Sequence, residues 1–379
     1  MPVGIPPRPI PAIIQPATPD ARPRLPYLVL SENSVSVKPA CQPDHFHQAS
    51  GINRPPPGPF SFLTAAQKSE AQAVFSVLGS AHPFLYKALL GRPFLVNQQD
   101  PYGQTFLHHL SSLASLILSA KLVETYRQAS PEHSKMSPSE IRRDLMVNCL
   151  RDQLERECIV QGDRPFCAFT ALVYALPASE FARIVVGLAG PGKVSLRGGG
   201  ELHLQDFDLT EHRGDCRNIC DRIIEAAVAA RGRPLHLGAG EVVLQNDGTP
   251  CTGASEEEFL ARIYELYGER YTFCGPSVMQ DMNDGGLTST PVWLELRVNG
   301  PIPARGHTVN FINIETVDGR SRVIFRDPNG PSLSEDGTFN LAYGAFVEDK
   351  RAGVYAMPLE MASMMDLRFV VPRSWVGPP

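Results

Sequence analysis

The sequence predicts an α+β fold, in which helices come first and antiparallel strands follow. Apolar residues recur at helical spacing through most of the region from residue 64 to residue 267. Beyond residue 290 they alternate with polar residues, and turn pairs such as Asn299-Gly300 and Asp318-Gly319 interrupt the pattern. Helices separated from antiparallel strands along the chain are typical of the α+β class.

Proline distinguishes residues 1–60 from the rest of the chain. Fifteen of the 35 prolines fall in this segment. Because proline lacks a backbone N–H and fixes φ, such a density opposes helices and sheets. We expect a largely disordered tail, which would be either a simple linker or an export segment. Met1 to Pro11 lacks a basic region followed by an apolar run, so we expect no Sec-type signal peptide.

Residues 61–158 are expected to form a small helical unit. Thr64-Ala65-Ala66-Gln67 and Ser137-Pro138-Ser139-Glu140 have the form of capping boxes and therefore predict two helix starts. Between them, an apolar stripe predicts one helix over residues 105–126. The sequence does not indicate the role of this unit. One possibility is a pro-region that covers a cleft and is released by self-cleavage near residue 158.

Residues 159–379 are expected to form the α+β domain itself. A helix starting near Pro165 should end before Pro177, because proline interrupts a helix. The remaining predicted helices cover residues 178–188, 218–230 and 255–267, and the predicted strands cover residues 292–298, 308–315, 321–326, 353–357 and 367–371.

Composition and charge exclude several classes of function. The net charge is −5 and the isoelectric point is near 6.1, and no basic stripe is interleaved with aromatic residues, so nothing favours a nucleic-acid partner. No apolar run reaches the length of a membrane span. The eight cysteines are expected to be free thiols in a reducing compartment. The oligomeric state is not indicated.

Cys167 is the first candidate catalytic residue. It falls in the first turn of the helix predicted to open at Pro165, and a helix N-terminus stabilises a thiolate. The unsatisfied N–H groups there also offer an oxyanion site, to which the Gln161 amide could add a second donor. The alternative is that Cys167 is a small buried apolar residue and Gln161 an ordinary loop residue.

The segment Gln161-Gly162-x-x-x-x-Cys167-Ala168-Phe169 resembles the active-site segment of papain-like cysteine peptidases. That family has a tryptophan directly after the cysteine, which this chain lacks. The resemblance implies a downstream histidine, and His307 follows Cys167 by 140 residues at the head of an apolar strand. It further implies that Cys167 is the nucleophile, that Gln161 lines the oxyanion hole, and that His307 is the base. The matching motifs lie between Gln161 and Gly330, a span of 170 residues.

The third catalytic group is less well defined by the sequence. The resemblance implies that Asp327 orients His307. However, a two-residue turn at Asp318-Gly319 would place Asp327 on the opposite face of the sheet from His307. A β-bulge or a longer turn is therefore required, or Asn329 or another residue is the partner.

Two other patterns carry less weight. Gly187-x-x-x-x-Gly192-Lys193 resembles a phosphate loop, but valine follows the lysine and a helix precedes it. His212, Cys216 and Cys220 have helical spacing suited to zinc, but no fourth ligand is evident. We therefore expect no cofactor and no metal.

These observations predict cysteine-dependent acyl transfer on a protein or peptide substrate, with peptide-bond hydrolysis as the first expectation. Deamidation or transglutamination of a protein glutamine would use the same residues. The alternative of another class is a catalytically inactive interaction protein that retains the fold. The tail and the missing signal peptide suggest a bacterial effector delivered by a specialised secretion system and acting inside a target cell.

Overall fold

A computed structural model describes residues 62–129, 133–156, 159, 166–205, 218–237, 243–245, 247–251, 253–275, 290–296, 307–328, 348–351, 353–360 and 367–376. The chain divides into two units, residues 1–55 and 56–379. The elements below all belong to the second unit. The predicted tail at residues 1–60 lies outside the described residues.

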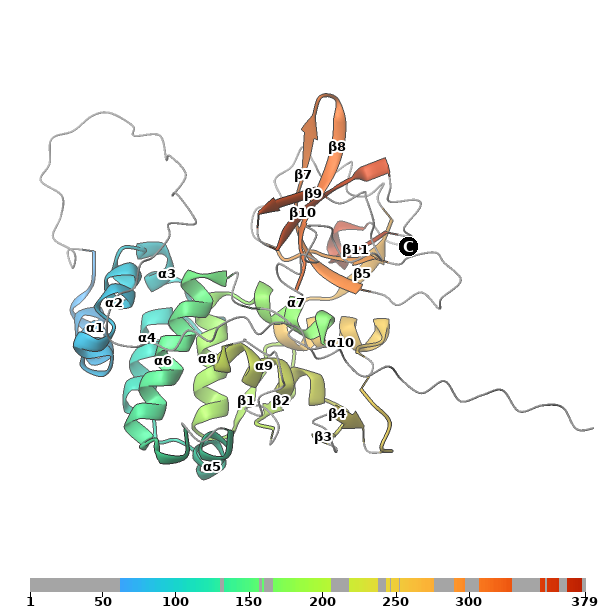
Figure 1. The fold of residues 1–379 in the computed structure, drawn as a ribbon. Coiled ribbons are helices and arrows are strands. Elements are labelled where there is room, and N and C mark those ends of the chain that lie inside the picture. Colours follow the sequence, from blue (N-terminus) through green and yellow to red (C-terminus); the bar gives the residue numbers. More distant parts are fainter. Residues whose placement is uncertain are drawn as a thin grey trace, which may run out of the picture. The chain divides into compact units, whose positions relative to one another are not determined.

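Helices dominate the described chain up to residue 267, and they precede most of the strands, as the α+β prediction requires (Figure 1). Three of them begin at capping boxes, where the side chains of Thr64, Ser137 and Ser255 accept hydrogen bonds from the backbone three residues on. The helices are α1 (Ala65–Leu78), α2 (Pro83–Leu90), α3 (Pro93–Asn97), α4 (Phe106–Ser115), α5 (Ala120–Ala129), α6 (Pro138–Leu154), α7 (Cys167–Ala175), α8 (Ala178–Ala189), α9 (Ile219–Ala230) and α10 (Glu256–Tyr267).

The single helix predicted over residues 105–126 is wrong, because the chain breaks between α4 and α5. Ser119 caps the second helix: its Oγ accepts a hydrogen bond of 3.1 Å from the backbone N–H of Leu122. The Ser119 N–H in turn donates to the carbonyl of Ala189 at the end of α8, over 2.9 Å. The break leaves Ile117, which lies within the predicted helix, 89% exposed.

The seven described strands after α10 form one sheet with the order β5-β11-β6-β7-β8-β10-β9, and every neighbouring pair is antiparallel. The five strands predicted beyond residue 290 correspond to β6, β7, β8, β10 and β11. The others were not predicted. The bounds are β1 (Lys193–Ser195), β2 (Glu201–His203), β3 (Leu235–Leu237), β4 (Val243–Gln245), β5 (Tyr271–Cys274), β6 (Trp293–Leu296), β7 (His307–Val317), β8 (Arg320–Arg326), β9 (Glu348–Arg351), β10 (Val354–Pro358) and β11 (Arg368–Pro372).

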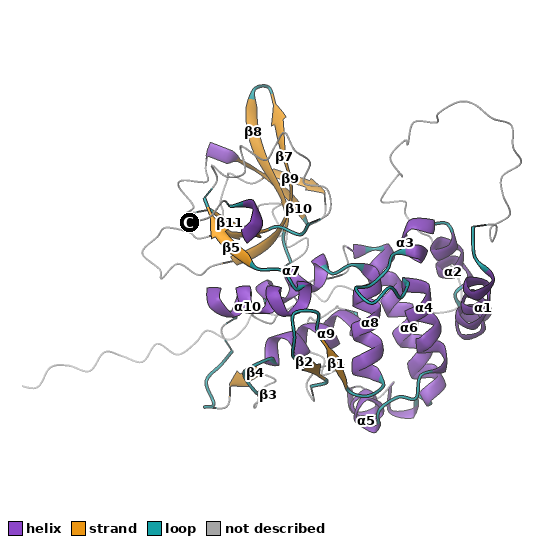
Figure 2. Cartoon of the chain, turned by 180° about the vertical axis from the view of Figure 1, so that it is seen from behind, coloured by secondary structure: helices purple, strands orange, loops and turns teal. Residues whose placement is uncertain are grey.

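The two faces of the large sheet bury different cores. On one face, Trp293 and Val370 join the apolar core of the helices, and both views show α7 and α10 between the sheet and the other helices (Figures 1 and 2). The opposite face gathers a separate core that includes Leu294, Val309 and Phe325. Helix α7 therefore lies at the boundary between the helical part and the sheet, directly against β7.

The cysteines at positions 149, 167, 220, 251 and 274 are free thiols, and the other three lie outside the described residues. None of the described helices is by itself both long and apolar enough to cross a membrane.

Candidate active site

Cys167 is the first residue of α7. Phe166 precedes it as N-cap and provides no side-chain hydrogen bond, so the first-turn N–H groups have no side-chain cap. The rest of the helix, from Ala168 to Val173, is buried, which fixes its axis. Cys167 itself is only half-buried. The sulfur of Cys167 is therefore held by a rigid helix and lies at the positive end of the helix dipole.

His307 is the first residue of β7, and its ring contacts a buried carboxylate. Its Nε2 lies 2.9 Å from Oδ1 of Asp327, and the two side chains are 12% and 1% exposed. The Asp327 backbone N–H donates over 3.1 Å to the carbonyl of Gly353, the turn residue before β10, which fixes the backbone that carries the carboxylate. Because Nε2 faces Asp327, Nδ1 is the ring nitrogen left for a second partner.

A β-bulge explains why Asp327 reaches His307. Ile312 is the extra residue of β7 at a shift in its pairing with β8. Asn310 of β7 pairs with Arg326 of β8. Extending this register by one residue places Val309 opposite Asp327. Val309 and His307 are two residues apart and share a face. Without the bulge, Asp327 would lie opposite Asn310, on the other face. The structure thus contains one of the solutions that the sequence left open.

The second partner of His307 is the thiol of Cys167, with which its ring forms a hydrogen bond. Burial alone would raise the pKa of Cys167, but the hydrogen bond and charge of His307, with the N–H groups of Thr308 and Ala168, lower it below its usual value. Burial alone would lower the pKa of His307, but the charge and hydrogen bond of Asp327, with those of Cys167, raise it to about 10. Both shifts favour a thiolate beside an imidazolium.

A second connection between α7 and the sheet lies one helical turn beyond the thiol. The Ala171 carbonyl accepts hydrogen bonds from Nδ2 of Asn310, at 2.7 Å, and from Nε1 of Trp293, at 3.2 Å. Tyr267 of α10 adds a bond of 2.9 Å from its hydroxyl to the carbonyl of Leu172. These donors fix the helix that carries Cys167 against the strand that carries His307.

Sequence reasoning missed these donors, although one signal was present. Asn310 is a polar residue within an otherwise apolar stretch of β7, and it is only 4% exposed. A buried amide needs a hydrogen-bonding partner, so its position alone marks a specific contact.

Two residues considered at this site cannot be placed. Gln161, the expected second oxyanion donor, and Asn329, the alternative partner of His307, both lie outside the described residues. The roles suggested for them stay predictions. The structure brings together the other three predicted residues, Cys167, His307 and Asp327.

The segments that resembled a phosphate loop and a zinc site have different structural surroundings. Gly187 lies within α8 and Lys193 opens β1, where its Nζ is 3.2 Å from Glu201, so this segment is not a loop between a strand and a helix. His212 and Cys216 lie outside the described residues, and the Sγ of Cys220 donates to the carbonyl of Leu145 within the core. No group of metal-binding side chains occurs among the described residues.

No protein-family model matches this chain, and no curated protein is similar to it in sequence.

Proposed function

We propose that this protein is a cysteine-dependent acyl-transfer enzyme with a papain-like fold, and that it hydrolyses peptide bonds of a protein substrate. The observation that carries the proposal is the chain of contacts from Asp327 through His307 to Cys167, with the sulfur at the start of a buried helix. A papain-like fold is supported by a cysteine-bearing helix packed against an antiparallel strand that begins with histidine.

In the first half of the reaction, the Cys167 thiolate attacks the carbonyl carbon of the substrate and forms a carbon–sulfur bond. The negative charge moves to the carbonyl oxygen, where the Cys167 N–H at the start of α7 can stabilise it. The Gln161 amide is the second donor that we propose. The His307 imidazolium then gives its proton to the leaving nitrogen, and the carbon–nitrogen bond breaks.

In the second half, water attacks the thioester that remains on Cys167. Neutral His307 takes a proton from this water, the carbon–sulfur bond breaks, and the substrate leaves as a carboxylic acid. The thiolate and the imidazolium are restored together. Throughout the cycle Asp327 holds the ring so that one nitrogen faces the sulfur.

The same residues would deamidate or transglutaminate a protein glutamine, since each reaction passes through a thioester. The products separate these reactions: a shortened chain indicates peptide hydrolysis, glutamate with released ammonia indicates deamidation, and an amine cross-link indicates transglutamination. Mass spectrometry of a candidate protein substrate distinguishes all three.

A thiol-reactive peptide-like probe tests whether the protein is an enzyme at all. We expect stoichiometric labelling of Cys167, complete loss of labelling in Cys167→Ser, and strong slowing in His307→Ala. Cys274 provides the matched control, because it is also a half-buried free thiol but burial raises its pKa to about 11. Cys274→Ser should label like the unmodified protein. Equal labelling of Cys167 and Cys274 would contradict the proposal and favour an inactive interaction protein.

A further inference from the structure

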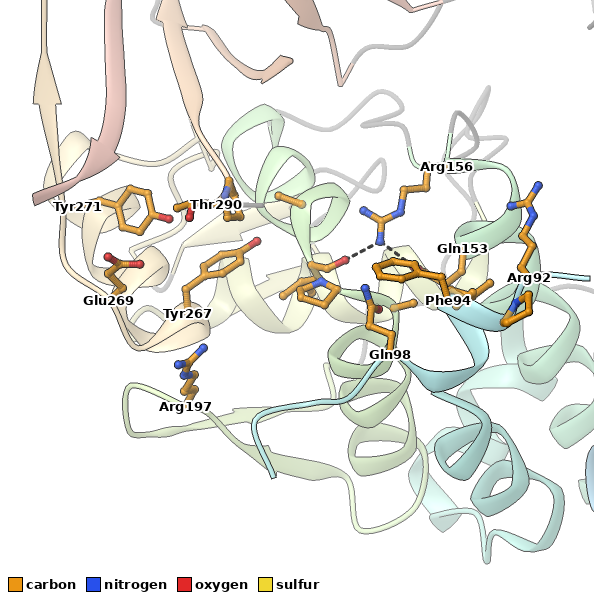
Figure 3. Close-up of a pocket in the computed structure, with 17 residues that line it drawn as sticks. Arg92, Phe94, Gln98, Gln153, Arg156, Arg197, Tyr267, Glu269, Tyr271 and Thr290 are labelled. Atoms are coloured by element: carbon orange, nitrogen blue, oxygen red, sulfur yellow. Dashed lines mark hydrogen bonds between the residues drawn. The ribbon is translucent and has the colours of Figure 1, made fainter. Parts of the chain in front are cut away.

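A cavity of about 740 Å³ lies at the end of α7 opposite Cys167 (Figure 3). Ala175 and Leu176, at the C-terminal end of the helix, belong to its wall. Eight residues at about 1.5 Å each separate Ala175 from Cys167, so the two ends are about 12 Å apart. Neither Cys167 nor His307 lines the cavity. It is therefore a site separate from the proposed catalytic residues.

The wall of this cavity carries an excess of positive charge. Arg92, Arg156 and Arg197 line it, against the single carboxylate of Glu269. Arg156 donates to the carbonyls of Tyr174 and Leu176 and to the Gln153 amide oxygen, and Arg92 donates to the carbonyl of Leu154. Among the described residues, no carboxylate pairs with any of these three guanidinium groups within 4.0 Å. The wall thus presents guanidinium groups whose positive charge is not neutralised by a described carboxylate.

A buried donor in the same wall has no partner. Gln153 is 6% exposed, and its Nε2 makes no hydrogen bond within the described part of the chain. Its Oε1 accepts from Arg156 over 2.9 Å, so amide and guanidinium lie together (Figure 3). An unpartnered buried amide donor costs about 1–3 kcal/mol. A ligand oxygen placed between Gln153 and the arginines would accept from both.

The cavity also offers aromatic surface. Phe94 lines it and is 82% exposed. Tyr267 and Tyr271 line the part of the cavity that lies away from Arg92 and Arg156 (Figure 3). A flat apolar group could lie against these rings.

We propose that this cavity binds a small organic anion, a molecule with a phosphate or carboxylate group attached to a flat apolar body. Arg92, Arg156 and Gln153 would hold the anionic group, and Phe94 would cover the apolar body. The volume is within the range of about 300–1,000 Å³ that is typical of small-molecule sites. The phosphate and carboxylate share the chemistry that guanidinium groups recognise.

Calorimetric titration of the full chain tests this proposal with four probes: 1-naphthyl phosphate, 1-naphthoate, neutral 1-naphthol and inorganic phosphate. We expect at least one aromatic anion to bind, at least tenfold more tightly than naphthol or inorganic phosphate. Its affinity should fall at least tenfold in Arg92→Gln and in Phe94→Ala. Both side chains are exposed, so neither change should disturb folding. Arg127→Gln, an exposed arginine on α5, removes the same charge elsewhere and should change nothing.

Binding by the phosphate alone, the carboxylate alone, or both supports the proposal and identifies the preferred group. Absence of heat with both aromatic anions at millimolar concentration would overturn it, as would equal losses in Arg92→Gln and Arg127→Gln. The titration needs no catalysis and should give the same result in Cys167→Ser. Its failure therefore leaves the proposed function intact, and failure of the proposed function leaves this site intact.

Discussion

The reactivity of Cys167 depends on how readily its sulfur loses a proton. The lowered pKa of Cys167 and the pKa of His307, raised to about 10, define a pH window in which the thiolate and the imidazolium coexist. The proposed peptidase activity should rise with pH as Cys167 loses its proton, since the thiolate is the proposed nucleophile. It should fall near pH 10 as His307 loses the proton that it gives to the leaving group. A pH profile of kcat/KM checks both limbs.

Asp327→Asn separates the contribution of the carboxylate from that of the ring. The substitution removes the negative charge that opposes the effect of burial on His307, so the pKa of His307 should fall and the alkaline limb should move to lower pH. Loss of a hydrogen bond to a charged group, worth about 1.5–3 kcal/mol, predicts a decrease in kcat/KM of roughly 10- to 150-fold. An alkaline limb that stays in place would show that another group holds the proton on His307.

At the scale of elements, the position of Cys167 relative to His307 depends on how α7 is attached to β7. Asn310→Ala removes the hydrogen bond of 2.7 Å to the Ala171 carbonyl, while the Trp293 bond stays. We expect a loss of about 1–3 kcal/mol in the free energy of unfolding, and slower probe labelling of Cys167 even where the protein is fully folded. Denaturant unfolding and labelling rates measure the two effects.

Asn313→Ala is the matched control for this substitution. Asn313 lies on the same strand but is exposed, so its removal should change the free energy of unfolding by less than about 0.5 kcal/mol. Unchanged labelling in Asn310→Ala would mean that the contact stabilises the fold without positioning the thiol.

Deletion of the bulged residue in β7 tests whether the strand register brings Asp327 to His307. Ile312 is the extra residue and is 39% exposed, so its own side chain contributes little apolar packing. Without it, His307 and Asp327 would face opposite sides of the sheet. We expect the deletion variant to keep its circular dichroism spectrum and lose most labelling of Cys167. Ile312→Ala, which keeps the bulge, should label normally. Normal labelling of the deletion variant would rule out Asp327 as the partner of His307.

These elements show which parts of the structure the sequence could specify. Capping at Thr64 and Ser137 is local and was predicted correctly, because the pattern needs only four consecutive residues. The break at Ser119 depends partly on a hydrogen bond to Ala189, 70 residues away. The local spacing of apolar residues carries no information about so distant a contact. The bulge at Ile312 was foreseen only as one of three alternatives, beside a longer turn or another partner for His307, since no local pattern marks it.

At the scale of the whole molecule, the helices of residues 65–154 and the helices that follow share one apolar core. Helix α9 is the clearest case: every residue from Ile219 to Ala229 is buried, between α6, α7 and α8. A helix that is buried on all sides depends on each of its neighbours. The boundary predicted at residue 158 therefore runs through a continuous core. A helical unit released there by self-cleavage would expose α9.

This continuity predicts the outcome of truncation. A chain that begins at residue 159 lacks α6 and α4, which cover α9 and α8, and should aggregate or unfold without a cooperative transition. A chain that begins at residue 56 keeps the whole second unit, and should unfold cooperatively and label at Cys167 like the full protein. Thermal unfolding followed by circular dichroism compares the two. If the shorter chain folds cooperatively and its Cys167 reacts at the full rate, the helical unit is dispensable and a removable pro-region becomes the better explanation.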